Sequence, residues 1–305
     1  MSSPASTPIK PLKPLRGVRV LSLALNLPGP AALMRLKAMG ATCLKAEPPG
    51  PKGAPAGTSG DPMGQYNPTA YATLHAGIRV LSIDLKTDKG QTRLHKELAR
   101  TDLLLTSFRP SALAKLGLSW KALHKAYPQL SVMAIVGAPG ARAEEPGHDL
   151  TYLADAGLVT GLELPATLFA DMGGALMASE AALKAVLAQK TRGQGSFQEV
   201  ALSDAAAWLA LPRDWGLTLP SGSVGGAHAG YRVYPCQDGR VAVAALEPHF
   251  AASLCTAAGV AMADVRTMFR PEVHTAIARF LAGQTRQQLN QLAAARDIPL
   301  HTLPA

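Results

Sequence analysis

The chain alternates between short apolar runs and helical patterns from Arg16 onward, and this alternation limits its fold more than any other feature. Strands are predicted over residues 18–25, 42–47, 79–85, 102–108, 130–136 and 197–202. Helices are predicted over 30–39 and 89–100, around Leu113 and Leu123, from Leu150, and over 173–189. Strands that alternate with helices form a parallel sheet covered on both faces. We therefore predict an α/β fold with a Rossmann-like parallel sheet, whose ligands bind beyond the carboxyl ends of the strands.

A glycine-rich segment, residues 220–230, is the best candidate for a domain boundary. Beyond it, residues 231–235 and 240–245 are predicted to form a hairpin, and helical patterns dominate to the C-terminus. The expected organisation has three parts, which are a flexible lead-in over residues 1–15, a large α/β domain over 16–220 and a smaller α+β domain over 221–305. A Gly/Pro-rich loop is expected over residues 48–68.

The composition points to a small anionic partner. The net charge is +9, which favours binding to anions. Lys and Arg are dispersed as single residues, and aromatic residues make up only 5% of the chain, so we expect no nucleic-acid partner. A nucleotide or a coenzyme fits this charge better.

Other classes of protein are disfavoured by what the sequence lacks. No apolar run reaches the ~20 residues of a membrane helix, and the N-terminal residues lack the apolar core of a signal peptide. We expect a cytoplasmic protein that does not bind a membrane. Cys43, Cys236 and Cys255 are far apart, so neither a disulfide framework nor a metal site is predicted.

The first strand, turn and helix suggest a dinucleotide site, and Glu47 stands where a ribose-binding acid would be expected. However, the turn over residues 26–30 reads N-L-P-G-P instead of G-x-G-x-x-G. Its prolines remove N–H donors that would hold a pyrophosphate. An NAD site is therefore not expected.

Two polar motifs are the best candidates for chemistry. His148 lies in a G-H-D motif, and Asp171, 23 positions later, lies in an A-D-M-G-G motif. An imidazole and a carboxylate are well suited to moving protons near neutral pH. Each also has a structural alternative, since His148 beside Asp149 is typical of a capping pair, and Asp171 is placed to cap a helix that starts at Gly173.

Several motifs, in the same order along the chain, resemble one known family. They are K-A-E-P at residues 45–48, the strand at 78–86, F-R-P at 108–110, L-G-L at 116–118, G-H-D-L at 147–150 and G-Q-G at 193–195. These segments resemble the family III CoA-transferases (CaiB/BaiF), which include the α-methylacyl-CoA racemases. The resemblance extends from about Pro14 to Pro304.

Within that family the chain is most similar to the racemase branch. The resemblance implies that His148 and Asp171 are the two acid/base residues, and that Glu247, in A-L-E-P-H-F, orients His148. It also implies that the backbone N–H of Asp149 and the Tyr152 hydroxyl are polar neighbours of the substrate. Transferase members use the residue equivalent to Asp171 as a nucleophile.

The resemblance also implies how coenzyme A is bound. Lys45, Arg79 and Arg109 are expected to contact its phosphates, because basic side chains pair with phosphate oxygens. Pro28 and Gly29 are expected to let the backbone approach the pantetheine arm. Coenzyme A enters as part of the substrate, and no other cofactor is expected.

The chain also departs from the family pattern. The interval between His148 and Asp171 is shorter than is typical, which is expected to change the acyl pocket. Residues 75–79 read H-A-G-I-R in place of N-R-G-K-R, so one basic contact to the coenzyme is expected to be missing. The small domain is expected to be truncated relative to the family, although a homodimer is still expected.

The sequence therefore predicts an acyl-CoA racemase/epimerase that interconverts (R)- and (S)-2-methylacyl-CoA through an enolate. The alternatives are a CoA-transferase that works through an Asp171 anhydride and a non-catalytic CoA-binding paralogue.

Overall fold

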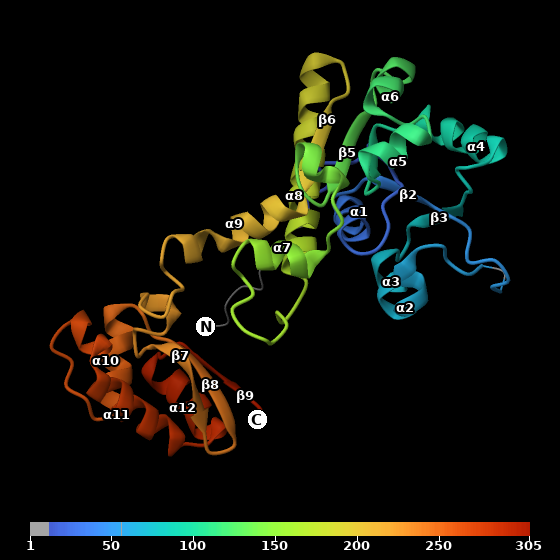
Figure 1. Ribbon diagram of the computed structural model, residues 1–305. Helices are drawn as coiled ribbons and strands as arrows, with labels where there is room; N and C mark the ends of the chain where they lie inside the picture. Colours follow the sequence, from blue (N-terminus) through green and yellow to red (C-terminus); the bar gives the residue numbers. More distant parts are fainter. Residues whose placement is uncertain (1–11, 56) are drawn as a thin grey trace, which may run out of the picture. The chain divides into compact units, whose positions relative to one another are not determined.

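The computed structural model describes residues 12–55 and 57–305, which form two units (Figure 1). The first unit ends at Ala210 and the second spans Leu211–Ala305. This division falls inside helix α9 (Leu202–Asp214). The domain boundary suggested by the glycine-rich segment therefore lies some residues beyond the division that the packing shows.

The N-terminal part of the first unit is packed from Leu15 onward. Leu15 is fully buried and donates its N–H to the Met39 carbonyl at 3.0 Å. The lead-in predicted over residues 1–15 lies mostly outside the described residues. Its last residue belongs to the core.

The first unit is built on a six-stranded parallel sheet with the strand order β3-β2-β1-β4-β5-β6. The strands are β1 (Arg19–Ser22), β2 (Thr42–Glu47), β3 (Arg79–Ser82), β4 (Leu103–Thr106), β5 (Ser131–Val136) and β6 (Phe197–Ala201). The predicted α/β fold with a parallel sheet is confirmed. The chain turns from β1 toward β2 on one side and continues with β4 on the other. The strand order thus reverses between β1 and β4, which is where such sheets bind ligands.

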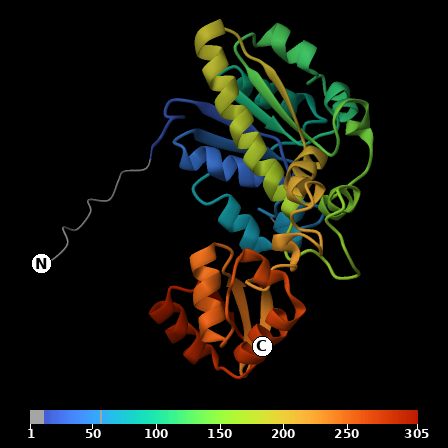
Figure 2. The ribbon, with the colours of Figure 1, turned by 90° about the vertical axis from the view of Figure 1, so that its left-hand side faces the viewer.

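Helices bury both faces of this sheet, as the alternation along β4 shows. Leu103 and Leu105 belong to the apolar cluster of α1 and α8, whereas Leu104 belongs to that of α4, α5 and α6. Figure 2 shows the long helix α8 lying across the sheet. The covering helices are α1 (Pro28–Ala38), α8 (Phe169–Arg192), α4 (Asp88–Leu98), α5 (Pro110–Lys115) and α6 (Trp120–Ala126).

The loop predicted over residues 48–68 is partly helical, which corrects the prediction. Helices α2 (Pro62–Tyr66) and α3 (Pro68–Leu74) each begin with proline. The side chains of Asp61 and Asn67 cap them by accepting backbone N–H groups. Asp-Pro and Asn-Pro are therefore helix starts here, because proline fits the first helical position and the preceding side chain satisfies a free donor.

The second unit is an antiparallel sheet with helices. Its strands, in the order β7-β8-β9, are β7 (Tyr231–Cys236), β8 (Gly239–Ala244) and β9 (Leu300–Leu303). Its helices are α10 (Pro248–Ala257), α11 (Pro271–Ala282) and α12 (Arg286–Arg296), with short 3-10 turns η2 (Ser223–Gly225) and η3 (Val265–Phe269). The hairpin was predicted, but β9 was missed because a four-residue strand has too few positions to show an alternation.

Candidate active site

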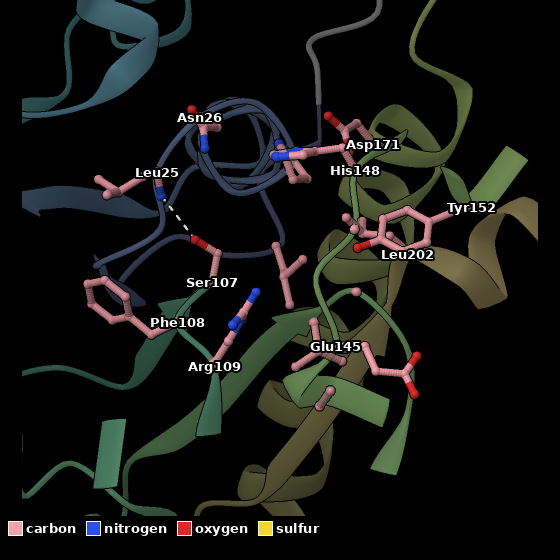
Figure 3. A pocket seen from close by; sticks show the side chains of 16 residues that line it. Leu25, Asn26, Ser107, Phe108, Arg109, Glu145, His148, Tyr152, Asp171 and Leu202 are labelled. Carbon is pink, nitrogen blue, oxygen red and sulfur yellow. Dashed lines mark hydrogen bonds between the residues drawn. The ribbon is translucent and has the colours of Figure 1, made fainter. Parts of the chain in front are cut away.

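A small cavity of about 170 Å³ lies beyond the carboxyl ends of β1, β4 and β5 (Figure 3). This is the place where the strand order reverses. Its walls come from the turns after these strands, from the loop that carries η1 (Gly140–Glu144), and from α7 (Asp149–Asp155) and α8. Its polar lining consists of Asn26, Ser107, Arg109, Glu145, His148, Tyr152 and Asp171.

His148 and Asp171 line the same cavity, although they are distant in sequence. A buried carboxylate connects the two helices that carry them. Asp149, the first residue of α7, accepts the N–H of Asp171 on its Oδ1 at 2.9 Å. This bond ties the start of α7 to the first turn of α8 and so places the two residues predicted as the acid/base pair together.

Asp171 lies in the first turn of α8, whose N-cap is Leu168. The alternative role of Asp171 as the N-cap of a helix starting at Gly173 is therefore wrong. Burial, reinforced by the charge of Asp149 and opposed by His148, raises the pKa of Asp171 from 3.8 to about 6. A carboxyl group with such a pKa exchanges protons readily near neutral pH.

His148 is the N-cap of α7 and has an extended backbone. Its backbone, and not its ring, makes the capping bonds with Thr151. The His148 N–H lies 3.1 Å from the Thr151 Oγ1, and the Thr151 hydroxyl donates to the His148 carbonyl at 2.7 Å. These bonds fix the His148 backbone at the start of α7, and its exposed side chain lines the cavity.

Two glycines make room for the Tyr152 phenol in the cavity. A Cβ atom at Gly137 would lie 2.3 Å from the Tyr152 hydroxyl oxygen, and one at Gly147 would lie 2.5 Å from it. Burial and the charge of Asp171 raise the pKa of Tyr152, while Arg109 opposes this rise. The hydroxyl therefore stays protonated near neutral pH and is available as a donor.

Arg109, at the start of α5, is exposed and lines the cavity. Three further polar residues that were not predicted from the sequence, Asn26, Ser107 and Glu145, also line it. Asn26 and Ser107 follow β1 and β4, and Glu145 pairs with Arg142 at 3.0 Å. Their position after parallel strands was a usable indication, because the carboxyl ends of such strands meet at one edge.

Pro28 also lines the cavity, and Gly29 follows it in the first turn of α1. A Cβ atom at Gly29 would lie 2.1 Å from the Ala24 Cβ atom. The glycine is therefore required by the packing of its own turn, whether or not a ligand approaches it.

Lys45 differs from the prediction that it contacts a coenzyme phosphate. Its side chain is fully buried and forms an ion pair with the equally buried Asp61. Its Nζ also lies 3.0 Å from the His75 Nε2 and 3.4 Å from the Glu47 carboxylate. The ammonium group is enclosed by these partners and does not face the surface.

Arg79 and Glu247 lie outside the cavity lining. Arg79, on β3, is largely exposed, and its guanidinium lies 3.7 Å from the Glu97 carboxylate. Glu247 belongs to the second unit, where it is the exposed N-cap of α10.

A second and larger cavity, of about 890 Å³, lies beyond the carboxyl ends of β2 and β3. It is lined by apolar residues such as Ile83 and Leu85. Its charged lining consists of the cations Lys86 and Lys115 and the carboxylates of Glu47, Asp84 and Asp88. Phe108 lines both cavities, so they adjoin one another.

In the residues that the structure describes, no group of His, Cys, Asp and Glu could hold a metal ion. Nor is any described helix both long enough and apolar enough to cross a membrane.

The chain is similar to known proteins over nearly its full length. The family model for CoA-transferase family III matches residues 15–303. A probable fatty acyl-CoA transferase of Mycobacterium tuberculosis, Rv3272, is 31% identical over 65% of this chain and 53% of its own length. The mouse (Mus musculus) alpha-methylacyl-CoA racemase is 28% identical over 93% of this chain and 76% of its own length.

The solved structure of Rv3272 has the same fold, with a TM-score of 0.81 and 24% sequence identity over 97% of this chain and 86% of that chain. The sequence match to Rv3272 spans only about half of that protein.

Proposed function

This chain belongs to CoA-transferase family III, and from that premise we propose that it is an acyl-CoA racemase/epimerase that interconverts (R)- and (S)-2-methylacyl-CoA. The observation that carries the proposal is the pairing of His148 and Asp171 in one cavity, with Asp149 joining their helices. Reversible proton transfer at a carbon atom needs a base and an acid of this kind.

The proposed reaction moves one proton on each side of the α-carbon. The Asp171 carboxylate takes the hydrogen next to the thioester carbonyl, and the electrons of the C–H bond pass into the carbonyl to form an enolate. Protonated His148 then delivers a proton to the opposite face of that carbon. This turnover leaves Asp171 protonated and His148 neutral, which is the state that converts the other enantiomer with the roles exchanged. Proton exchange with water restores the starting state for a further turnover in the same direction.

The enolate oxygen carries negative charge and needs donors. The Tyr152 hydroxyl, which the two glycines admit into the cavity, is one such group. The backbone N–H of Asp149 at the start of α7 is a second. Donors fixed in place before the reaction stabilise such an oxyanion efficiently.

The larger cavity supports a coenzyme A thioester as substrate. It offers apolar walls for the adenine and the cations Lys86 and Lys115 for phosphates. Because Phe108 lines both cavities, an extended pantetheine arm can pass from the larger cavity to the smaller one, with Arg109 beside its path.

The test is exchange in heavy water. We expect deuterium to appear at the α-carbon of a 2-methylacyl-CoA, and Asp171→Asn and His148→Gln to slow this exchange at least about 100-fold. Glu180→Gln, which breaks only an exposed pair with Lys184, is the matched control and keeps the wild-type rate. Absence of exchange with every branched acyl-CoA tested would refute the proposal.

CoA transfer is the second candidate, and the presence of a transferase among the relatives favours it. Here the Asp171 carboxylate attacks the thioester and expels CoA thiolate, which leaves a mixed anhydride. The thiolate then attacks the aspartyl carbonyl, releases the first acid and leaves an aspartyl-CoA thioester that a second acid uses. Hydroxylamine would convert these intermediates to a hydroxamate at Asp171, which mass spectrometry detects.

These enzymes differ in their need for His148. Transfer through Asp171 survives His148→Gln, whereas racemisation does not. Binding of CoA in calorimetry without exchange or transfer would instead identify a non-catalytic paralogue. We also propose a homodimer, to be tested by light scattering.

A further inference from the structure

The turn that follows β1 has an unusual backbone at Asn26. Its φ angle is +62°, in the left-handed region that residues other than glycine seldom occupy, although asparagine tolerates it better than most. Asn26 lines the small cavity together with His148 and Asp171 (Figure 3). The conformation is therefore held at the candidate active site.

A buried aspartate fixes this turn from outside the cavity. The Oδ1 atom of Asp61 accepts the N–H groups of Asn26 and Met63, each at 3.0 Å. Its other oxygen is paired with the ammonium group of Lys45, and both charged side chains are completely buried. Since Asp61 starts α2, the segment between β2 and β3 supports a wall of the cavity.

The remaining bonds of Lys45 make this support rigid. The His75 Nδ1 lies 2.7 Å from the Tyr71 carbonyl, so it carries the proton and the Nε2 atom accepts a bond from Lys45 at 3.0 Å. The Glu47 carboxylate lies 3.4 Å from the same ammonium and accepts the hydroxyl of Tyr71. Every charged group of this cluster thus has a fixed partner.

The Lys45 cluster is expected to contribute little to the free energy of folding. A buried ion pair contributes little net stability, because removing two charges from water offsets their attraction. Its position behind the cavity turn gives it a second purpose. On the other side of the same turn, the Leu25 N–H donates to the Ser107 Oγ at 3.1 Å. Hydrogen bonds to Asp61 and to Ser107 therefore hold the turn on both sides.

Within the described residues, the side-chain amide of Asn26 makes no hydrogen bond to protein, although it lines the cavity. We propose that this amide donates an N–H bond to the thioester carbonyl oxygen of the substrate, and that Asp61, fixed by Lys45, positions it. The inference rests on the proposed function, since it assumes that an acyl thioester occupies the small cavity. Asn26 would then be a catalytic residue and Asp61 a positioning residue.

Two substitutions separate the amide from the backbone conformation. Asn26→Gly accepts a positive φ but lacks the amide, whereas Asn26→Ala lacks the amide and disfavours the turn. We expect kcat for α-proton exchange to fall about 100-fold in both variants, the effect of removing one oxyanion donor. A wild-type rate in Asn26→Gly would show a conformational role only and would overturn the proposal.

A double substitution tests the role of Asp61. In Asp61→Asn the Oδ1 atom can still accept the Asn26 N–H, but the new NH₂ group faces the Lys45 ammonium. We expect kcat to fall about 10- to 100-fold, as misplacement of a reacting group does, with a smaller change in KM. Adding Lys45→Met removes the conflicting ammonium and should restore much of kcat.

Equal kcat in the single and double variants would reject Asp61 as a positioning residue. Glu180→Gln, which breaks only a surface pair with Lys184, is the matched control and keeps the wild-type kcat. Thermal unfolding of each variant separates loss of fold from loss of position.

A readout without turnover distinguishes this inference from the proposed function. The side-chain amide resonances of Asn26, identified by their absence in Asn26→Gly, should shift when a 2-methylacyl-CoA is added and shift less with CoA alone. A shift without proton exchange would leave the contact standing and refute the racemase. Proton exchange without a shift of the Asn26 amide resonances would support the racemase and refute the contact between Asn26 and the substrate.

Discussion

The first unit contains two pairs of neighbouring carboxylates, and, among the residues that the structure describes, only one of these pairs forms ion pairs with a basic side chain. Glu47 and Asp61 enclose the ammonium of Lys45 and are buried. Asp171 lines the small cavity, and the buried Asp149 accepts its backbone N–H; neither forms an ion pair with a described residue. The same residue type is thus neutralised in one place and left poised for proton transfer in the other.

This difference shows how the fold separates support from chemistry. The charged groups of the cluster around Lys45 are paired with one another, and Asp61 holds the Asn26 turn. At the cavity, burial and the neighbouring Asp149 raise the pKa of Asp171, which makes its ionisation costly and its proton transferable.

Removing the cation should break the supporting cluster. We expect Lys45→Met to lower the free energy of unfolding by about 3–5 kcal/mol, because it leaves the buried carboxylates of Glu47 and Asp61 without a neutralising cation. Urea unfolding measures this change. The surface substitution Lys184→Met is the control, since its pair with Glu180 is exposed, and it should cost less than about 1 kcal/mol. Similar losses of unfolding free energy in Lys45→Met and Lys184→Met would show that Lys45 does not neutralise buried carboxylates.

Removing the Asp171 carboxylate should increase the free energy of unfolding, whereas removing Lys45 should decrease it. The pKa of Asp171 is raised in the folded state, so below about pH 4 the group is protonated in both states and costs nothing. As the pH rises from about 4 to about 6, the unfolded chain loses this proton while the folded chain still holds it, and stability falls. We therefore expect Asp171→Asn to stabilise the protein by about 2–3 kcal/mol at pH 8, relative to its effect at pH 3.5.

Urea unfolding of Asp171→Asn and wild type at both pH values gives that difference. Glu163→Asn, at an exposed position, should show no such dependence on pH. A stabilisation that is equal at pH 3.5 and pH 8 would show that Asp171 ionises normally in the folded protein.

Much of the fold followed from local patterns. The parallel strands were predicted because each is an apolar run bounded by turn residues, and β2 was placed at residues 42–47 as observed. The start of α8 was predicted four residues late, because the glycine pair at 173 and 174 suggested a helix start, whereas Phe169 already begins the helix. Helices α2 and α3 were missed since they are short and depend on their caps.

The candidate site was predictable only in part. The motifs indicated His148 and Asp171, but the bond from Asp149 that joins them depends on packing between two helices. Lys45 was expected at a phosphate because the K-A-E-P motif resembles that of the family. Its actual partners, Asp61 and His75, come 16 and 30 positions later, and no local pattern links residues so far apart.

The position of the Tyr152 hydroxyl can be tested by substitutions with a smaller expected effect. In Gly137→Ala the new methyl group would meet the Tyr152 hydroxyl, so we expect a loss of about 1–3 kcal/mol in unfolding free energy and slower proton exchange. Adding Tyr152→Phe removes the hydroxyl and should recover the stability but not the rate. Gly161→Ala, where a Cβ atom meets open space, is the control. A stable, fully active Gly137→Ala would show that Tyr152 is not confined there.

The smallest effect is expected where the charge is open to water. The Arg79 side chain is 63% exposed and pairs only loosely with Glu97, so Arg79→Ala should change stability by less than about 1 kcal/mol. If Arg79 also contacts a coenzyme phosphate, KM for the acyl-CoA should rise by up to about fivefold at low salt with kcat unchanged. The increase should shrink as salt rises, because screening weakens exposed charges much more than enclosed ones such as Lys45. Initial rates at low and high ionic strength measure this, and a salt-independent increase in KM would contradict a phosphate contact at Arg79.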